Sequence, residues 1–189
     1  FKSEKLSILY LVCGSLFFYG WWNIQLLPLL LFSIIINFSI GHYLLKYRKK
    51  SILFFGIFFN LVLIITFKYL DFSIFTINLI FSSNFYPQNI VLPLAISFFT
   101  FQQIAFLADV YANKTSDYKF LHYATYVSFF PQLIAGPIVH HKELMPQFDD
   151  LAKRKTNIKN ISLGLFIFSI GLFKKVVIAD SLAEFVSTG

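Results

Sequence analysis

Apolar runs of membrane length alternate with short polar links along this chain. A helix that crosses the hydrocarbon core of a bilayer needs about 20 mostly apolar residues, because each residue adds about 1.5 Å. Four runs approach this length, at residues 6–22, 26–45, 52–69 and 92–111. The pattern predicts an all-α integral membrane protein that crosses the bilayer several times. We expect residues 1–189 to form a single membrane domain that is a fragment of a longer protein.

Three other segments depart from a plain span. Residues 71–89 mix Ser, Asn and Pro with apolar residues, which indicates a loop with a short interfacial helix. The apolar stretch 123–139 holds two prolines and a glycine: Pro131, Gly136 and Pro137. We expect a broken or re-entrant helix there, because proline removes a backbone donor and disrupts the preceding turn. The last stretch, 161–185, contains Lys174 and Lys175, so we expect a short or interfacial helix.

Composition supports a membrane location and argues against nucleic acid as a partner. Hydrophobic residues make up 57% of the chain, charged residues only 13%, and the mean hydropathy is +0.70. Soluble domains are closer to half apolar and a quarter charged. The net charge of +7 comes from Lys and Arg that cluster between apolar runs, so lipid head groups explain it better. The single Cys13 excludes an internal disulfide and a cysteine-based metal cluster.

Basic residues also predict which way the spans run. If the spans alternate, Lys2, Lys5, the cluster at 46–50 and the link at 114–119 fall on one side of the membrane. The loops at 23–25 and 71–89, on the other side, hold no Lys or Arg. The positive-inside rule therefore places the basic side in the cytoplasm.

The run 92–111 carries more polar residues than the earlier three. On a helix, Ser97, Thr100 and Gln103 follow one flank, whereas Gln102 and Asp109 share another face. An Asp facing lipid costs about 2.5–3.5 kcal/mol at a helix centre, so these side chains should face protein or water. Two interpretations remain open: hydrogen bonds that hold helices together, with Asp109 at the interface, or the wall of a substrate path.

The segment 129–141, FFPQLIAGPIVHH, is the second candidate for a substrate path. Broken backbone at membrane depth survives only where protein buries it or where it lines a wet cavity. The candidate residues are Gln132, Gly136, Pro137 and His140. The alternative is a simple kink, with His140 and His141 as solvated residues of a basic loop. Adjacent histidines point to different sides of a helix, so we expect no metal site.

Several ordered motifs together resemble the membrane-bound O-acyltransferase family, in its alginate and peptidoglycan O-acetylation branch. The motifs are LPLAISFFTFQQIAFLADVY, FFPQLIAGPIVHHKELMPQF and GLFKKVVIADSLA, with Trp21-Trp22 and Phe67-Lys68-Tyr69 before them. The resemblance implies a ring of membrane helices around a tunnel in the bacterial cytoplasmic membrane. An acyl group, expected to be acetyl, would pass to hydroxyls of an extracytoplasmic polysaccharide.

The resemblance also implies the donor, the partners and the catalytic residue. The donor would be acetyl-CoA or an acyl carrier on the cytoplasmic side, with no covalently bound cofactor, and the acceptor a polysaccharide or a periplasmic partner acetyltransferase. The family's catalytic His lies in a Trp-His element beyond the motifs found here. None of the four histidines matches it: His42, His122, His140 and His141. We therefore expect no catalytic residue in this chain, which should be inactive alone.

Two other classes of function fit the residues themselves. Polar residues within spans and a broken helix suit a transporter or channel for an acyl group or solute, and also a non-catalytic scaffold that docks periplasmic partners. A Trp-His pair inside a further apolar segment would favour the transferase. The residues do not name the acceptor polymer, the acyl donor or the oligomeric state.

Overall fold

A computed structural model describes most of the chain: residues 4–114, 118–136, 139–149 and 157–187. Every regular element within these ranges is a helix, which confirms the expected all-α class. The chain divides into two compact units, Phe1–Asp149 and Asp150–Gly189. That both units form one membrane domain stays a prediction.

Helices α1 (Glu4–Trp22) and α2 (Leu27–Tyr47) follow the first two apolar runs. Between them lies the short 3₁₀ helix η1 (Ile24–Leu26), capped by the side chain of Asn23. Pro28 stands in the first turn of α2, where a missing backbone N–H costs no helical hydrogen bond. The uncharged link therefore ends one helix and begins the next within a few residues.

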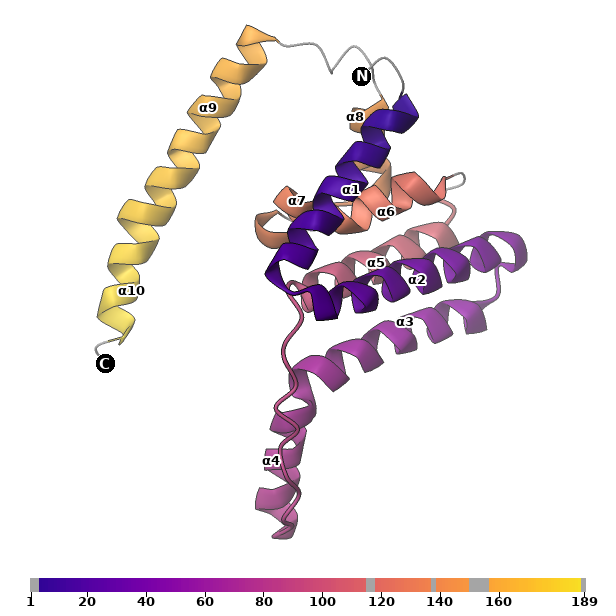
Figure 1. The fold of residues 1–189 in the computed structure, drawn as a ribbon, viewed down its shortest axis with the longest axis vertical. Coiled ribbons are helices and arrows are strands. Elements are labelled where there is room, and N and C mark those ends of the chain that lie inside the picture. The colour runs from indigo at the N-terminus through magenta and orange to yellow at the C-terminus, as the bar shows by residue number, and fades with distance from the viewer. Residues whose placement is uncertain (1–3, 115–117, 137–138, 150–156, 188–189) are drawn as a thin grey trace. The chain divides into compact units, whose positions relative to one another are not determined.

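Helix α3 (Lys50–Ile64) continues without a break through the π-helical turn η2 (Ile65–Tyr69) into α4 (Leu70–Phe81). The helix thus extends well past Tyr69, where the apolar run was expected to end. Figure 1 shows that α4 leaves in a different direction from α3, with the bend at η2. A π turn is one of the few features that bend a helix sharply.

The chain returns from the end of α4 in an extended segment that lies along this helix (Figure 1). The carboxylate of Asp71 fixes this return by accepting hydrogen bonds from the backbone N–H groups of Gln88, at 2.7 Å, and Asn89, at 3.0 Å. Segment 71–89 is therefore half helix and half extended backbone. The sequence predicted a loop with a short interfacial helix here, and the helical part continues directly from α3.

Four helices complete the first unit: α5 (Ile96–Tyr111), α6 (Phe120–Ser128), α7 (Phe130–Ala135) and α8 (His141–Asp149). Helix α5 is the centre of the unit, because it packs against α2, α3 and α6. Helix α1 packs against α6 and α7, and α6 also contacts α8.

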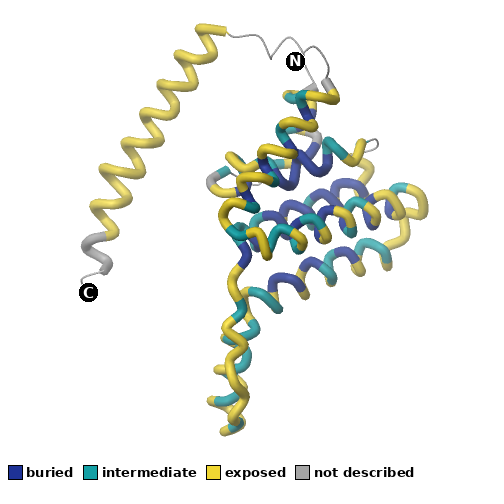
Figure 2. The backbone as a smooth tube through the Cα atoms, viewed as in Figure 1, coloured by how far each residue is buried: buried dark blue, intermediate teal, exposed yellow. Residues whose placement is uncertain are grey.

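The core of this unit lies where α2, α3, α5 and α6 face one another, as the dark blue faces in Figure 2 show. Phe99, Phe106 and Leu107 of α5 are completely buried. The opposite faces carry large exposed apolar side chains such as Phe54 and Phe58 of α3. A soluble protein rarely exposes apolar patches of this extent, so these faces fit lipid as their solvent.

The second unit is one long helix made of α9 (Ile158–Phe173), the π turn η4 (Lys174–Ala179) and α10 (Asp180–Ser187). Its lysine pair does not interrupt the helix, and Lys175 forms an ion pair with Asp180. The 26 residues of Ile158–Ala183 are long and apolar enough to cross a membrane, as are Ile24–Tyr47 and Lys50–Phe81. This helix is longer than the short helix expected from the lysine pair, and whether it spans the membrane or lies at the interface stays a prediction.

Candidate functional site

The polar side chains of α5 point to different neighbouring helices. On one flank the Oε1 of Gln103 accepts hydrogen bonds from two residues of α2, the hydroxyl of Ser33 at 2.9 Å and the amide of Asn37. Asn37 in turn accepts a bond from the Nδ2 of Asn60 in α3, at 2.6 Å. Thr100 hydrogen-bonds the carbonyl oxygen of Ile96 in its own helix, at 2.6 Å. At Gln103, therefore, polar side chains hold helices together, whereas Thr100 bonds within α5.

The partners of Gln103 in this buried network were not predicted from the sequence. Ser33, Asn37 and Asn60 are completely buried, and each has apolar residues on both sides in the sequence. An amide facing lipid is costly, so a single Asn within a membrane-length run is itself a signal of a helix contact. The spacing of Asn37 and Asn60 gave no sign that they would meet each other.

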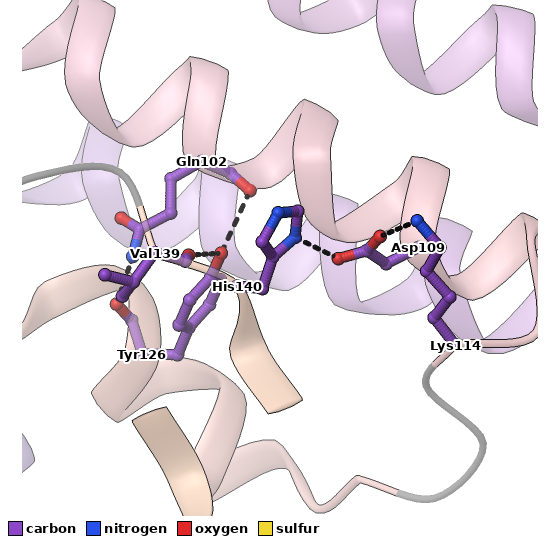
Figure 3. Close-up of polar contacts among 6 residues, drawn as sticks. All are labelled: Gln102, Asp109, Lys114, Tyr126, Val139 and His140. Carbon is purple, nitrogen blue, oxygen red and sulfur yellow. Dashed lines mark hydrogen bonds and ion pairs between the residues drawn. The ribbon is translucent and has the colours of Figure 1, made fainter. Parts of the chain in front are cut away.

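The other face of α5 fastens the broken segment to the bundle (Figure 3). Gln102 donates from Nε2 to the backbone oxygen of Tyr126 in α6, at 2.9 Å. The hydroxyl of Tyr126 donates to the backbone oxygen of Val139, at 2.9 Å, just before His140. Two side chains therefore connect α5, α6 and the segment that leads into α8.

Asp109, His140 and Lys114 form an ion-pair cluster next to this connection, as Figure 3 shows. The Oδ2 of Asp109 lies 2.5 Å from the Nδ1 of His140, and its Oδ1 lies 3.7 Å from the Nζ of Lys114. The carboxylate is almost buried, with 6% of its side chain exposed, whereas His140 is 48% and Lys114 is 55% exposed. An anion at this depth is stabilised by two positively charged or hydrogen-bonding partners.

This arrangement gives His140 a defined orientation. A carboxylate on Nδ1 holds the ring in place and favours the tautomer whose Nε2 can accept a proton. Figure 3 shows Nε2 directed away from Asp109. The cluster can thus accept and release a proton at Nε2, or bind an anion when the ring is protonated. His140 is thus held by Asp109, while 48% of its side chain stays exposed.

His141 is buried, at 5% exposure, whereas the side chain of the adjacent His140 is 48% exposed. Its ring centre lies 5.3 Å from that of Tyr126, 5.5 Å from Phe106 and 6.0 Å from Tyr118. Burial raises the pKa of the Tyr118 hydroxyl, so this phenol stays neutral over the physiological range. His141 therefore helps to fix the start of α8 on the aromatic core.

The broken segment has two separate breaks. Helix α6 ends at Ser128, and α7 begins one residue later with Pro131 in its first turn rather than in a helix interior. The backbone N–H of Phe130 donates to the hydroxyl of Ser15 in α1, at 3.4 Å. The second break is at Gly136, whose backbone is extended. A broken helix was expected here, and the structure confirms it.

Gly136 lies against the preceding turn. A Cβ at this position would meet the Cγ of Gln132 at 2.6 Å and its Cα at 2.8 Å. Gln132 is half-buried on α7 beside it. Pro137, the remaining candidate of this segment, lies outside the described residues.

Ser97 does not join these candidates. Its hydroxyl accepts a hydrogen bond from the Nζ of Lys68 in η2, at 3.3 Å. Ser97 and Asp109 are twelve residues apart on α5, which corresponds to about 18 Å along the axis. The structure thus brings Gln102, Asp109 and His140 into one region and leaves Ser97 near the other end of α5.

Comparison with known proteins identifies the family of this chain. The membrane-bound O-acyltransferase family model matches residues 16–189. A peptidoglycan O-acetyltransferase of Helicobacter pylori is 47% identical over all of this chain and 41% of its own length. The probable alginate O-acetylases AlgI of Pseudomonas aeruginosa and Azotobacter vinelandii are 33% and 34% identical, over 96% and 93% of this chain and 36% of their own lengths.

The chain therefore spans about two fifths of the length of the curated relatives it matches. No solved structure shows significant similarity to it. The family match extends over both units described above and includes every residue of the Asp109–His140 region. The chain belongs to the membrane-bound O-acyltransferase family.

Proposed function

We propose that this chain is part of a membrane O-acyltransferase that transfers an acetyl group to hydroxyls of an extracytoplasmic polysaccharide. The observation that carries the proposal is the 47% identity, over the whole chain, to a peptidoglycan O-acetyltransferase. The chain would act in the bacterial cytoplasmic membrane, with its basic loops in the cytoplasm. The acetyl donor would be acetyl-CoA or an acyl carrier on the cytoplasmic side. The acceptor would be the polysaccharide itself or a periplasmic partner acetyltransferase.

Within such an enzyme we assign the described part of the broken segment to the wall of the substrate path. Three features support this role: the helix breaks at Phe129 and Gly136, Gln102 and Tyr126 hold the segment on α5 and α6, and Asp109 orients His140. Non-helical backbone within a membrane protein is typical of sites that bind or conduct a ligand. His140 would bind or position substrate there, while Ser97 would have a structural role.

The experiment that tests the activity uses the full-length gene in its own host. We expect deletion to remove O-acetyl groups from a cell-envelope polysaccharide, measured by mass spectrometry of muropeptides and of mild-alkali-released acetate, and a plasmid copy to restore them. Unchanged acetylation of every envelope polymer after deletion would refute the proposal. A transporter of an unrelated solute would give that result.

The role of His140 is tested by His140→Gln, with His42→Gln as the matched control. His42 is exposed on α2. We expect His140→Gln to lower acetylation about tenfold at unchanged membrane abundance, because the neutral amide neither accepts a proton nor binds an anion as imidazole does. His42→Gln should keep wild-type acetylation. Equal activity of the two variants would remove His140 from the substrate path.

A further inference from the structure

An apolar groove of about 650 Å³ lies in the crevice between α2 and α3. Its α2 wall is formed by side chains that recur at helical spacing. Its α3 wall is formed by the first two turns of α3. The lining residues that matter here are Ile36, Tyr43, Tyr47, Lys49, Ile52 and Phe55. The volume lies within the range of about 300–1,000 Å³ that small-molecule sites occupy.

The groove opens on an exposed side of the α2–α3 hairpin, where Ser39, Tyr43 and Phe55 are exposed. The groove lining includes Ile40, which is buried and belongs to the core, whereas other buried residues of α2, such as Ile34, Asn37 and Leu44, do not line it. Tyr43 and Tyr47 are both exposed, and their rings stack with centroids 6.3 Å apart. Tyrosine is enriched where a membrane protein meets the interfacial layer. Within the first unit, the groove is therefore open to lipid molecules of the surrounding bilayer.

One end of the groove carries a dense positive charge. Lys49 lines the groove, and the hairpin around it carries three more exposed basic residues, Lys46, Arg48 and Lys50. Lys46 lies over the ring of Tyr47, with Nζ 5.3 Å from the ring centre. Residues 5–70 contain no Asp or Glu. This charge therefore has no acidic partner on the helices that form the groove.

We propose that the groove binds an anionic glycerophospholipid. One acyl chain would lie along the apolar walls, and the phosphate would meet the ammonium group of Lys49 and its basic neighbours. Basic pockets between membrane helices on the cytoplasmic side are the sites where anionic head groups bind. The positive-inside rule places this hairpin on that side. A zwitterionic lipid would fill the walls equally well but would gain less from the cations.

The groove chemistry distinguishes the lipid from two other occupants. Inorganic phosphate would satisfy Lys49 but would leave the apolar walls facing water or hydrocarbon. An apolar protein segment would fill the walls but would leave the basic cluster unpaired. Only a molecule that joins an anionic group to a long apolar chain matches both parts of the site.

The test uses the full-length protein in nanodiscs that hold equal amounts of phosphatidylglycerol and phosphatidylcholine, with retained lipid measured by native mass spectrometry. We expect phosphatidylglycerol to be retained at least fivefold over phosphatidylcholine. Lys49→Gln should lower this preference about fivefold. One basic residue near the membrane surface changes the affinity for an anionic lipid by about this factor. The matched control is Lys68→Gln, which removes one cation from η2 outside the groove.

A second variant keeps every charge and fills the space. Ser39 is an exposed groove residue of α2, so Ser39→Trp should displace the acyl chain while the protein stays monodisperse. We expect loss of retained phosphatidylglycerol. The proposal would be overturned if the wild-type protein retained both lipids equally, or if Lys49→Gln and Lys68→Gln lost the same amount of phosphatidylglycerol. It would also be overturned if Ser39→Trp retained all of its phosphatidylglycerol, or if millimolar inorganic phosphate displaced this lipid. Absence of any retained lipid from the wild-type protein, as when a protein segment covers the groove, would overturn it too.

Discussion

Gly56 lies where α3 packs closely against both α2 and α5, and replacing it tests this packing. An added Cβ would lie 2.5 Å from the Cδ1 of Leu107 in α5 and 3.1 Å from the Cγ2 of Ile40 in α2. Leu107 presents the far end of a flexible side chain, so it can rotate away from one methyl group. Ile40 is β-branched and stiff, and it has much less freedom to move. Gly56→Ala should therefore be tolerated, whereas Gly56→Leu should not.

The cost of Gly56→Leu has two parts. Extra carbons in a well-packed core cost about 1–3 kcal/mol, because neighbouring side chains leave their preferred rotamers or the helices move apart. One turn further along α3, Asn60 donates to Asn37 of α2 at 2.6 Å, and separation of the helices would lengthen this bond. An interhelical hydrogen bond in a membrane protein contributes about 0.6 kcal/mol on average. We expect a total destabilisation of about 2–3 kcal/mol.

The measurement is the unfolding of the full-length protein in mixed micelles as the fraction of SDS is raised. Gly14 on α1 provides the matched control, because a Cβ there would meet nothing within 4 Å. Gly14→Leu makes the same substitution at another helical glycine. It should leave the free energy of unfolding unchanged or raise it slightly, because Leu favours a helix more than Gly does. The reasoning fails if Gly56→Leu unfolds at the same SDS fraction as Gly14→Leu.

Three further predictions concern the polar contacts. Gln103→Leu removes two cross-helix hydrogen bonds and should lower the free energy of unfolding in SDS by about 1–2 kcal/mol, whereas lipid-facing Phe101→Leu should change it little. Tyr126→Phe removes the donor to Val139 and should speed proteolysis of the following loop without altering helix content, and unchanged cleavage would contradict the tether. Asp71→Ala frees the extended return segment after α4, so its amide hydrogens should exchange at least tenfold faster, and equal exchange would show that the carboxylate does not hold it.

Local pattern in the sequence predicted most of the helices and missed how two of them continue. The runs at 6–22 and 26–45 contain helices whose ends are set by Asn23, Pro28 and the basic hairpin. The run expected to end at Tyr69 instead passes through a π turn into α4. A π turn keeps the helical hydrogen bonding while it changes direction, and no residue type marks it. The same misjudgement affected η4.

The candidate site shows the same division. Face spacing on α5 correctly separated Gln102 and Asp109 from Gln103, because helical periodicity is a local property. It also placed Ser97 among the candidates, although the structure puts this residue beside Lys68. The different environments of the two adjacent histidines, one beside Asp109 and one among aromatic rings, could not be predicted from a two-residue motif.

The sequence by itself determined that the chain is a bundle of membrane helices, because apolar length and charge position are properties that a bilayer selects directly. It also determined where the helical path of the broken segment stops, because proline and glycine act on their own backbone. Only the tertiary structure decided that Asp109 meets His140, 31 residues away, and that Asn37 meets Asn60. Such pairs depend on how helices rotate and cross, and many side chains far apart in the sequence settle that packing together.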